Sequence, residues 1–98
     1  MSLKFNGNIT IDEVFSQNKS IIYDNVLKKI GESHLDQSVT EVKVITITIN
    51  KVEYSITLGR DKFIASLENA ISFYESVEEY EKCQECLNII SDIKLKKY

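Results

Sequence analysis

The sequence contains no proline, only three glycines and a single arginine, and each scarcity limits what the chain can be. Without proline, breaks in regular structure are expected at Gly7, Gly31 and Gly59. The single arginine, Arg60, and the net charge of −3 argue against direct nucleic-acid binding, because phosphate and base recognition depend on clustered basic side chains. We therefore expect no direct nucleic-acid partner.

Long apolar runs are also missing. No stretch approaches the roughly 18 to 20 apolar residues of a membrane-spanning helix. The first ten residues, MSLKFNGNIT, lack the apolar core of a signal peptide. These absences predict a cytoplasmic protein with no membrane partner and with reduced thiols.

Motifs of catalysis are missing as well. The chain has no Gly-rich phosphate loop and no zinc-protease helix motif. Its only histidine, His34, lies in the polar segment Glu32–Ser38, which we interpret as a solvated loop. Ser33 and Asp36 stand beside it, but members of a catalytic triad converge from separate elements. We predict no enzymatic activity, no catalytic residues and no cofactor.

The chain does contain the pattern of one domain over residues 1–98, with 43% hydrophobic residues. Thr10-Ile11-Asp12-Glu13 fits a capping box and predicts the start of a helix. Apolar residues between Phe15 and Ile30 share one helical face, and Gly31 is expected to end the helix. Because residues 16–20 are poor helix formers, a division of this helix into two is the alternative.

Residues 41–49 are rich in β-branched side chains and residues 52–58 alternate apolar with polar side chains, which predicts two strands joined by a turn at Asn50-Lys51. This turn sets an antiparallel register with the apolar pairs Ile49–Val52, Ile47–Tyr54 and Ile45–Ile56 on the core face. Asn6-Gly7 is a second turn signal, between extended pieces at 3–5 and 8–11. A third short strand in this segment is therefore an alternative to a two-stranded hairpin.

Two further helices are expected, one over 62–75 with Asp61 as N-cap and one ending near residue 96. The predicted fold is therefore α+β: an N-terminal helix, an antiparallel β-hairpin with the third strand left open, and a C-terminal helical hairpin packed on one sheet face. The open sheet edges favour pairing with another chain, and a homodimer is one expected arrangement.

The two cysteines, Cys83 and Cys86, have the spacing of metal and redox sites. On the last helix they share a stripe with other apolar side chains, and we interpret both as core thiols; the stripe comprises Tyr80, Cys83, Cys86, Leu87, Ile90 and Ile93. A zinc site needs four ligands, and the chain offers only these thiols and His34 besides carboxylates. We predict no metal, with a metal-binding or redox pair as the alternative.

Glutamates crowd the same region, with Lys82 as the lone basic residue between positions 68 and 85. Such a face is suited to a basic protein surface, and the alternative is an ordinary solvated helix face. The candidate partner-binding residues are Glu75, Glu78, Glu79, Glu81 and Glu85.

Residues 67–90 resemble the UVR motif, a helical hairpin that mediates protein–protein contact in bacterial excision-repair subunits. Leu67-Glu68-Asn69-Ala70-Ile71 and Tyr80-Glu81-Lys82-Cys83 carry the likeness, whereas the family's Arg-Asp positions read Leu87-Asn88. In its small size and lack of catalytic motifs, the chain is also similar to phage and prophage accessory proteins, including anti-CRISPR inhibitors.

The leading interpretation is a non-enzymatic protein-binding module that presents the acidic helical hairpin or a sheet edge to a protein partner. The likeness to phage accessory proteins implies that this partner is a basic, nucleic-acid-handling host enzyme, which the chain inhibits. Two alternatives remain open. One is a small metal- or thiol-dependent regulator that uses Cys83 and Cys86, and the other is a structural subunit of a homo-oligomer.

Overall fold

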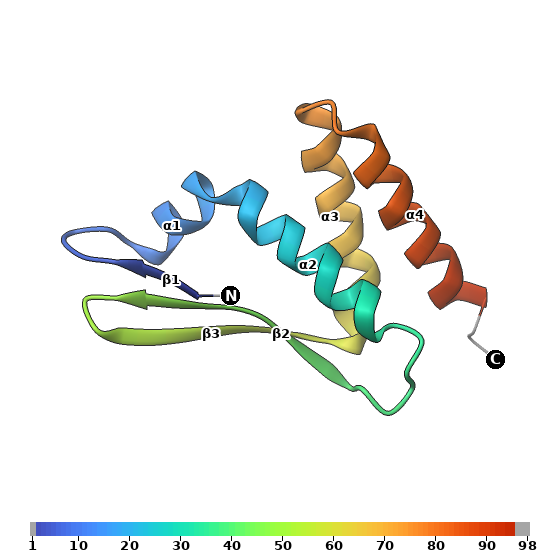
Figure 1. Cartoon of the computed structure of the whole chain (residues 1–98), viewed down its shortest axis with the longest axis horizontal. Helices are drawn as coiled ribbons and strands as arrows, with labels where there is room; N and C mark the ends of the chain where they lie inside the picture. Colours follow the sequence, from blue (N-terminus) through green and yellow to red (C-terminus); the bar gives the residue numbers. More distant parts are fainter. Residues whose placement is uncertain (1, 96–98) are drawn as a thin grey trace.

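The computed structural model describes residues 2–95, in which a three-stranded sheet lies beside four α-helices (Figure 1). The α+β class predicted from the sequence is confirmed. In chain order the elements are β1 (Ser2–Phe5), α1 (Ile11–Gln17), α2 (Lys19–Ser33), β2 (Glu41–Ile49), β3 (Val52–Gly59), a 3-10 turn (Arg60–Lys62), α3 (Phe63–Ser76) and α4 (Tyr80–Leu95).

The hairpin of β2 and β3 has the predicted register, with Ile49 opposite Val52 and Ile47 opposite Tyr54. Asn50 and Lys51 have φ angles of 49° and 70°, the left-handed values that a two-residue hairpin turn of type I′ requires. The sequence did not predict the bulge between Lys43 and Ile45, which shifts the register near the start of β2.

The third strand, β1, pairs with β2 in parallel and forms one edge of the sheet. The expectation of a second extended piece at 8–11 was wrong, because Ile11 already begins α1. The turn at Gly7 is held by Asn50, whose side-chain oxygen accepts from Gly7 N at 2.9 Å and whose amide nitrogen donates to Gly7 O at 2.8 Å. The hairpin turn therefore also anchors the loop that follows β1.

The N-terminal helix is divided in two, as the residues at 16–20 indicated. The capping box at Thr10 and Glu13 is present, and Asn18 separates α1 from α2. Gly31 does not end the helix, because α2 continues to Ser33 with His34 as its C-cap. The prediction that Asp61 is the N-cap of the next helix was also wrong, because Asp61 lies in a 3-10 turn and α3 has no side-chain cap.

The helices build outward from the sheet. α2 packs on β2, α3 on α2 and α4 on α3, so the C-terminal hairpin reaches the sheet mainly through α2 (Figure 1). The shared core includes the fully buried side chains of Val14, Ile30, Ile47, Phe63, Leu67 and Tyr74. None of the helices in residues 2–95 combines the length and apolar character needed to cross a membrane.

The molecule is flat, with extents of 47 × 33 × 16 Å. Its radius of gyration is 14.3 Å, whereas a compact chain of this length has about 12.6 Å. One consequence is that the helices leave β3 partly uncovered: Val52 and Tyr54 belong to the core-facing row but are 54% and 43% exposed.

The loop between α2 and β2 is held by Arg60, the only arginine of the chain. Its guanidinium donates to four backbone carbonyls of that loop region, those of Ser33, His34, Asp36 and Val39. It also lies 5.3 Å from the centre of the Phe63 ring. Arg60 therefore has a structural role in the fold.

Candidate functional site

The candidate site is the turn between α3 and α4, which we call the acidic tip and define by Glu75, Glu78, Glu79, Glu81 and Glu85. α3 ends here in a Schellman motif, in which Glu78 N donates to Glu75 O at 3.2 Å and Glu79 N donates to Tyr74 O at 2.9 Å. The chain reverses at Glu78, so Glu75 at the end of α3 and Glu79 and Glu81 beside the start of α4 flank the turn, and Glu85 follows about one helical turn further along α4. All five side chains are exposed.

Glu78 has a φ angle of 60°, a left-handed conformation that glycine usually adopts at this position of a helix end. A glutamate at this position is disfavoured relative to glycine, because its Cβ crowds the backbone. The tip therefore carries a carboxylate at a place where local stability favours no side chain at all.

Lys82, the only cation of this stretch, is bound within the fold. Its Nζ lies 2.9 Å from Glu79 Oε2 and 3.1 Å from Asp24 Oδ1 on α2. Hydrogen bonds to Glu79 and then Asp24 raise the pKa of Lys82. The other four carboxylates of the acidic tip make no ion pair within residues 2–95.

Tyr74 supports the tip from beneath. Its ring is fully buried and its hydroxyl donates to Asp24 Oδ1 at 2.7 Å. Burial, followed by the hydrogen bond to Asp24, raises the pKa of Tyr74 well above its usual range. The contacts among Asp24, Tyr74 and Lys82 join α2, α3 and α4, so the acidic tip has a fixed position relative to the rest of the molecule.

Two exposed hydrophobic residues stand among the glutamates: Val77 is 49% exposed and Tyr80 is 62% exposed. The prediction that Tyr80 faces the core was wrong, because Tyr80 is the first residue of α4 and its side chain is mostly exposed. Leu87, expected on the same stripe, is 49% exposed. A shallow hollow of about 400 Å³ follows residues 78–82 at the tip.

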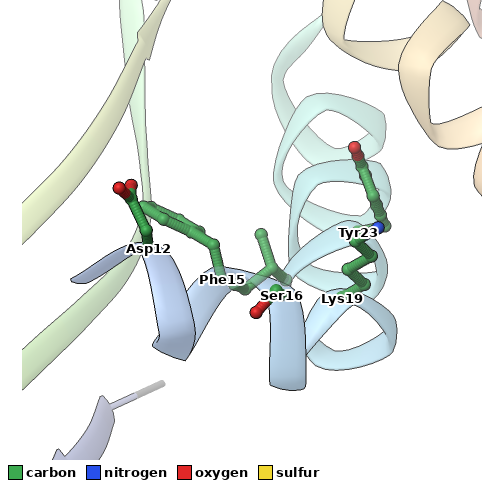
Figure 2. Close-up of a pocket in the computed structure, with 6 residues that line it drawn as sticks. Asp12, Phe15, Ser16, Lys19 and Tyr23 are labelled. Atoms are coloured by element: carbon green, nitrogen blue, oxygen red, sulfur yellow. The ribbon is translucent and has the colours of Figure 1, made fainter. Parts of the chain in front are cut away.

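A second hollow lies where α1 meets α2, away from the predicted residues (Figure 2). It measures about 380 Å³ and its wall is largely apolar, with Phe15, Ile22 and Tyr23 as its hydrophobic members. Asp12, Ser16 and Lys19 supply its polar groups, and the Ser16 hydroxyl donates to the carbonyl of Glu13 at 3.2 Å. No histidine or cysteine lines it.

Cys83 and Cys86 are buried and free, which confirms their interpretation as core thiols. The Cys83 Sγ is 3.6 Å from the carbonyl of Ile71 on α3. Burial raises the pKa of both thiols, that of Cys86 to about 11, so both are protonated at neutral pH. In the part of the chain that the structure describes, no three His, Cys, Asp or Glu side chains form a group that could hold a metal ion.

His34 is only 7% exposed, so its interpretation as a solvated loop residue was wrong. Its Nδ1 lies 3.2 Å from the carbonyls of Ile30 and Gly31, and its Nε2 lies 3.2 Å from Asp92 Oδ2 on α4. The ring thus caps α2 and links it to α4. A pattern search could not find this pair, since its members are 58 residues apart.

Comparison with known proteins gives no relative: no protein-family model, no curated protein and no solved structure matches the chain.

Proposed function

We propose that this protein is a non-enzymatic binding protein that inhibits a nucleic-acid-handling enzyme by docking its acidic tip on a basic surface of that enzyme. The observation that carries the proposal is the combination of four carboxylates without a cation and two exposed hydrophobic side chains, Val77 and Tyr80, at one corner. The likeness to small phage accessory proteins agrees with an inhibitor of this kind.

The carboxylates supply steering and selectivity. A surface that binds a phosphate backbone is lined by Lys and Arg. Closely spaced carboxylates carry the same negative charge as the phosphates, so they are attracted to such a surface. Glu79 is already paired with Lys82, so Glu75, Glu78, Glu81 and Glu85 are the free contributors. Nucleic acid should compete with the tip for the same surface.

The exposed hydrophobic side chains supply the anchor. Charged groups at the rim of an interface mainly change association rate and salt dependence, whereas buried aromatic side chains commonly dominate the affinity. Tyr80 has the ring and hydroxyl typical of such a residue. Because the network of Asp24, Tyr74 and Lys82 joins the helices that carry the tip, little backbone entropy is lost when a partner binds.

The test is capture of a partner from a bacterial lysate, followed by inhibition of the captured enzyme after purification. A triple variant, E78K/E81K/E85K, removes the acidic tip. The matched control, E32K/E41K/E68K, makes the same charge change at exposed glutamates outside the tip. We expect wild type and the control variant to capture the same enzyme and the tip variant to capture none of it. High salt or added DNA should release the captured enzyme.

Binding that survives high salt and is equal in the two triple variants would contradict the proposal. A captured protein whose activity is unchanged by the chain would contradict the inhibitory part alone. The variant Glu78→Gly adds a control for folding, because it deletes one carboxylate at a position where glycine is the preferred residue. Weaker capture by this variant cannot be attributed to loss of stability.

A further inference from the structure

β3 is an open sheet edge with little protection against pairing. Sheets usually blunt their edges with short strands, lysine, proline or bulges. The opposite edge, β1, has four residues including Lys4, whereas β3 has eight residues without lysine or proline. Within residues 2–95 the strand order is β1-β2-β3, so β3 is an edge strand that is hydrogen-bonded to β2 alone.

The backbone groups that face the open edge can be assigned. The two-residue turn makes Ile49 and Val52 a hydrogen-bonded pair, and hydrogen bonding then alternates along an antiparallel ladder. At the other end of β3, Arg60 N donates to Thr40 O at 2.8 Å, which agrees with this alternation. The N–H and C=O groups of Glu53, Ser55 and Thr57 therefore point away from β2.

We propose that β3 pairs with β3 of a second copy of this chain, antiparallel about a two-fold axis at Ser55, to form a six-stranded sheet across the dimer. In this register three residues of each copy exchange six backbone hydrogen bonds. The side-chain pairs across the interface are Val52 with Leu58, Tyr54 with Ile56 and Glu53 with Thr57, one residue of each pair from each copy.

The strand is self-complementary in this register. The apolar residues of the core-facing row meet apolar residues, and the only charge of the strand, Glu53, lies opposite an uncharged threonine. Neighbouring registers fit less well. An axis at Tyr54 places Leu58 opposite Asn50 of the turn, and an axis at Ile56 places Val52 opposite Arg60.

A second copy also explains why the core-facing row is exposed at Val52 and Tyr54. In the dimer these side chains lie beside Leu58 and Ile56 of the second copy and extend one apolar row across the axis. The acidic tip takes no part in this contact, so loss of the dimer and loss of partner capture are separate results.

The experiment measures mass in solution by light scattering or sedimentation over a wide concentration range. We expect wild type at twice the chain mass of 11.3 kDa. Ser55→Lys places two like charges on the axis and should weaken association about tenfold or more. An equal mixture of the S55K and S55E chains should regain the dimer, because opposite charges then meet.

Thr57→Lys is the matched control, because in this register it places the same charge opposite Glu53 of the second copy and the dimer should persist. Wild type at the chain mass at every concentration would overturn the proposal. Equal weakening by S55K and T57K, or failure of the S55K and S55E mixture to associate, would overturn the register. Circular dichroism on each variant shows that the monomer is folded.

Discussion

Replacement of Arg60 by alanine should be among the most damaging single changes outside the apolar core. The guanidinium donates to Val39 O at 2.8 Å, to His34 O at 3.2 Å and to Ser33 O at 3.3 Å, as well as to Asp36 O. These carbonyls belong to the segment that turns the chain from α2 into β2, so Arg60 holds a segment that has no regular hydrogen-bond ladder of its own.

The magnitude follows from these contacts. A hydrogen bond to a charged group contributes about 1.5–3 kcal/mol. The bond to Asp36 O is exposed and the other three are part-buried, so the carbonyls regain only part of their hydrogen bonding from water when Arg60 is absent. We therefore expect a loss of about 2–3 kcal/mol for the set of four. The contact with the Phe63 ring adds about 0.5 kcal/mol. A domain of this size has a total stability of about 5–15 kcal/mol, and its midpoint temperature should fall by about 10–20 °C.

Urea and thermal unfolding measure this loss by circular dichroism and tyrosine fluorescence at one fixed protein concentration, since the chain contains five tyrosines and no tryptophan. Arg60→Lys keeps the charge but loses the planar fork that reaches several carbonyls, so it should recover less than half of the lost stability. Lys62→Ala, at an exposed neighbouring position, should change stability by about 0.5 kcal/mol or less. An Arg60→Ala loss below about 1 kcal/mol, or an Arg60→Lys variant equal to wild type, would refute this reasoning.

Three further predictions concern the C-terminal hairpin. Tyr74→Phe removes the 2.7 Å hydrogen bond to Asp24 and should cost about 1–2 kcal/mol in urea unfolding, whereas an unchanged midpoint would mean that the bond adds nothing. Glu78→Gly should raise the free energy of unfolding by about 0.5–1 kcal/mol, and a decrease would show that the carboxylate itself stabilises the turn. Because burial raises the pKa of Cys86 from 9.0 to about 11, the stability from its protonated thiol is complete below pH 9 and is lost as the pH rises toward 11. Cys86→Ala should therefore flatten the decline of stability between pH 9 and 11, and native thiols should react with a disulfide reagent far more slowly than unfolded ones.

The two proposals describe different parts of one molecule. The acidic tip lies at the α3–α4 turn and the dimer contact lies on β3, which are far apart in Figure 1. A β3-paired dimer would carry two acidic tips, and binding of a partner with two basic surfaces would then gain from avidity. Comparing capture by wild type with capture by Ser55→Lys measures this gain directly.

Much of the hairpin could be read from local pattern. The β-branched content of residues 41–49 identified β2, and alternation at period two identified β3. The left-handed residues of the Asn50-Lys51 turn fixed which side chains are opposite each other. The buried thiols followed in the same way from their place on an apolar helical stripe. The same projection was wrong for Tyr80 and Leu87, which are exposed, because a helical projection does not show which part of an apolar stripe a neighbouring helix covers.

The amino-acid order by itself determined the helix start at Thr10, the break near Asn18, the hairpin register and the burial of Cys83 and Cys86, because each depends on spacing within a few residues. Only the tertiary structure decided the parallel pairing of β1, the burial of His34 against Asp92 and the structural use of Arg60. These features depend on segments brought together from distant parts of the chain, where the contact geometry, rather than the residue type, selects the outcome.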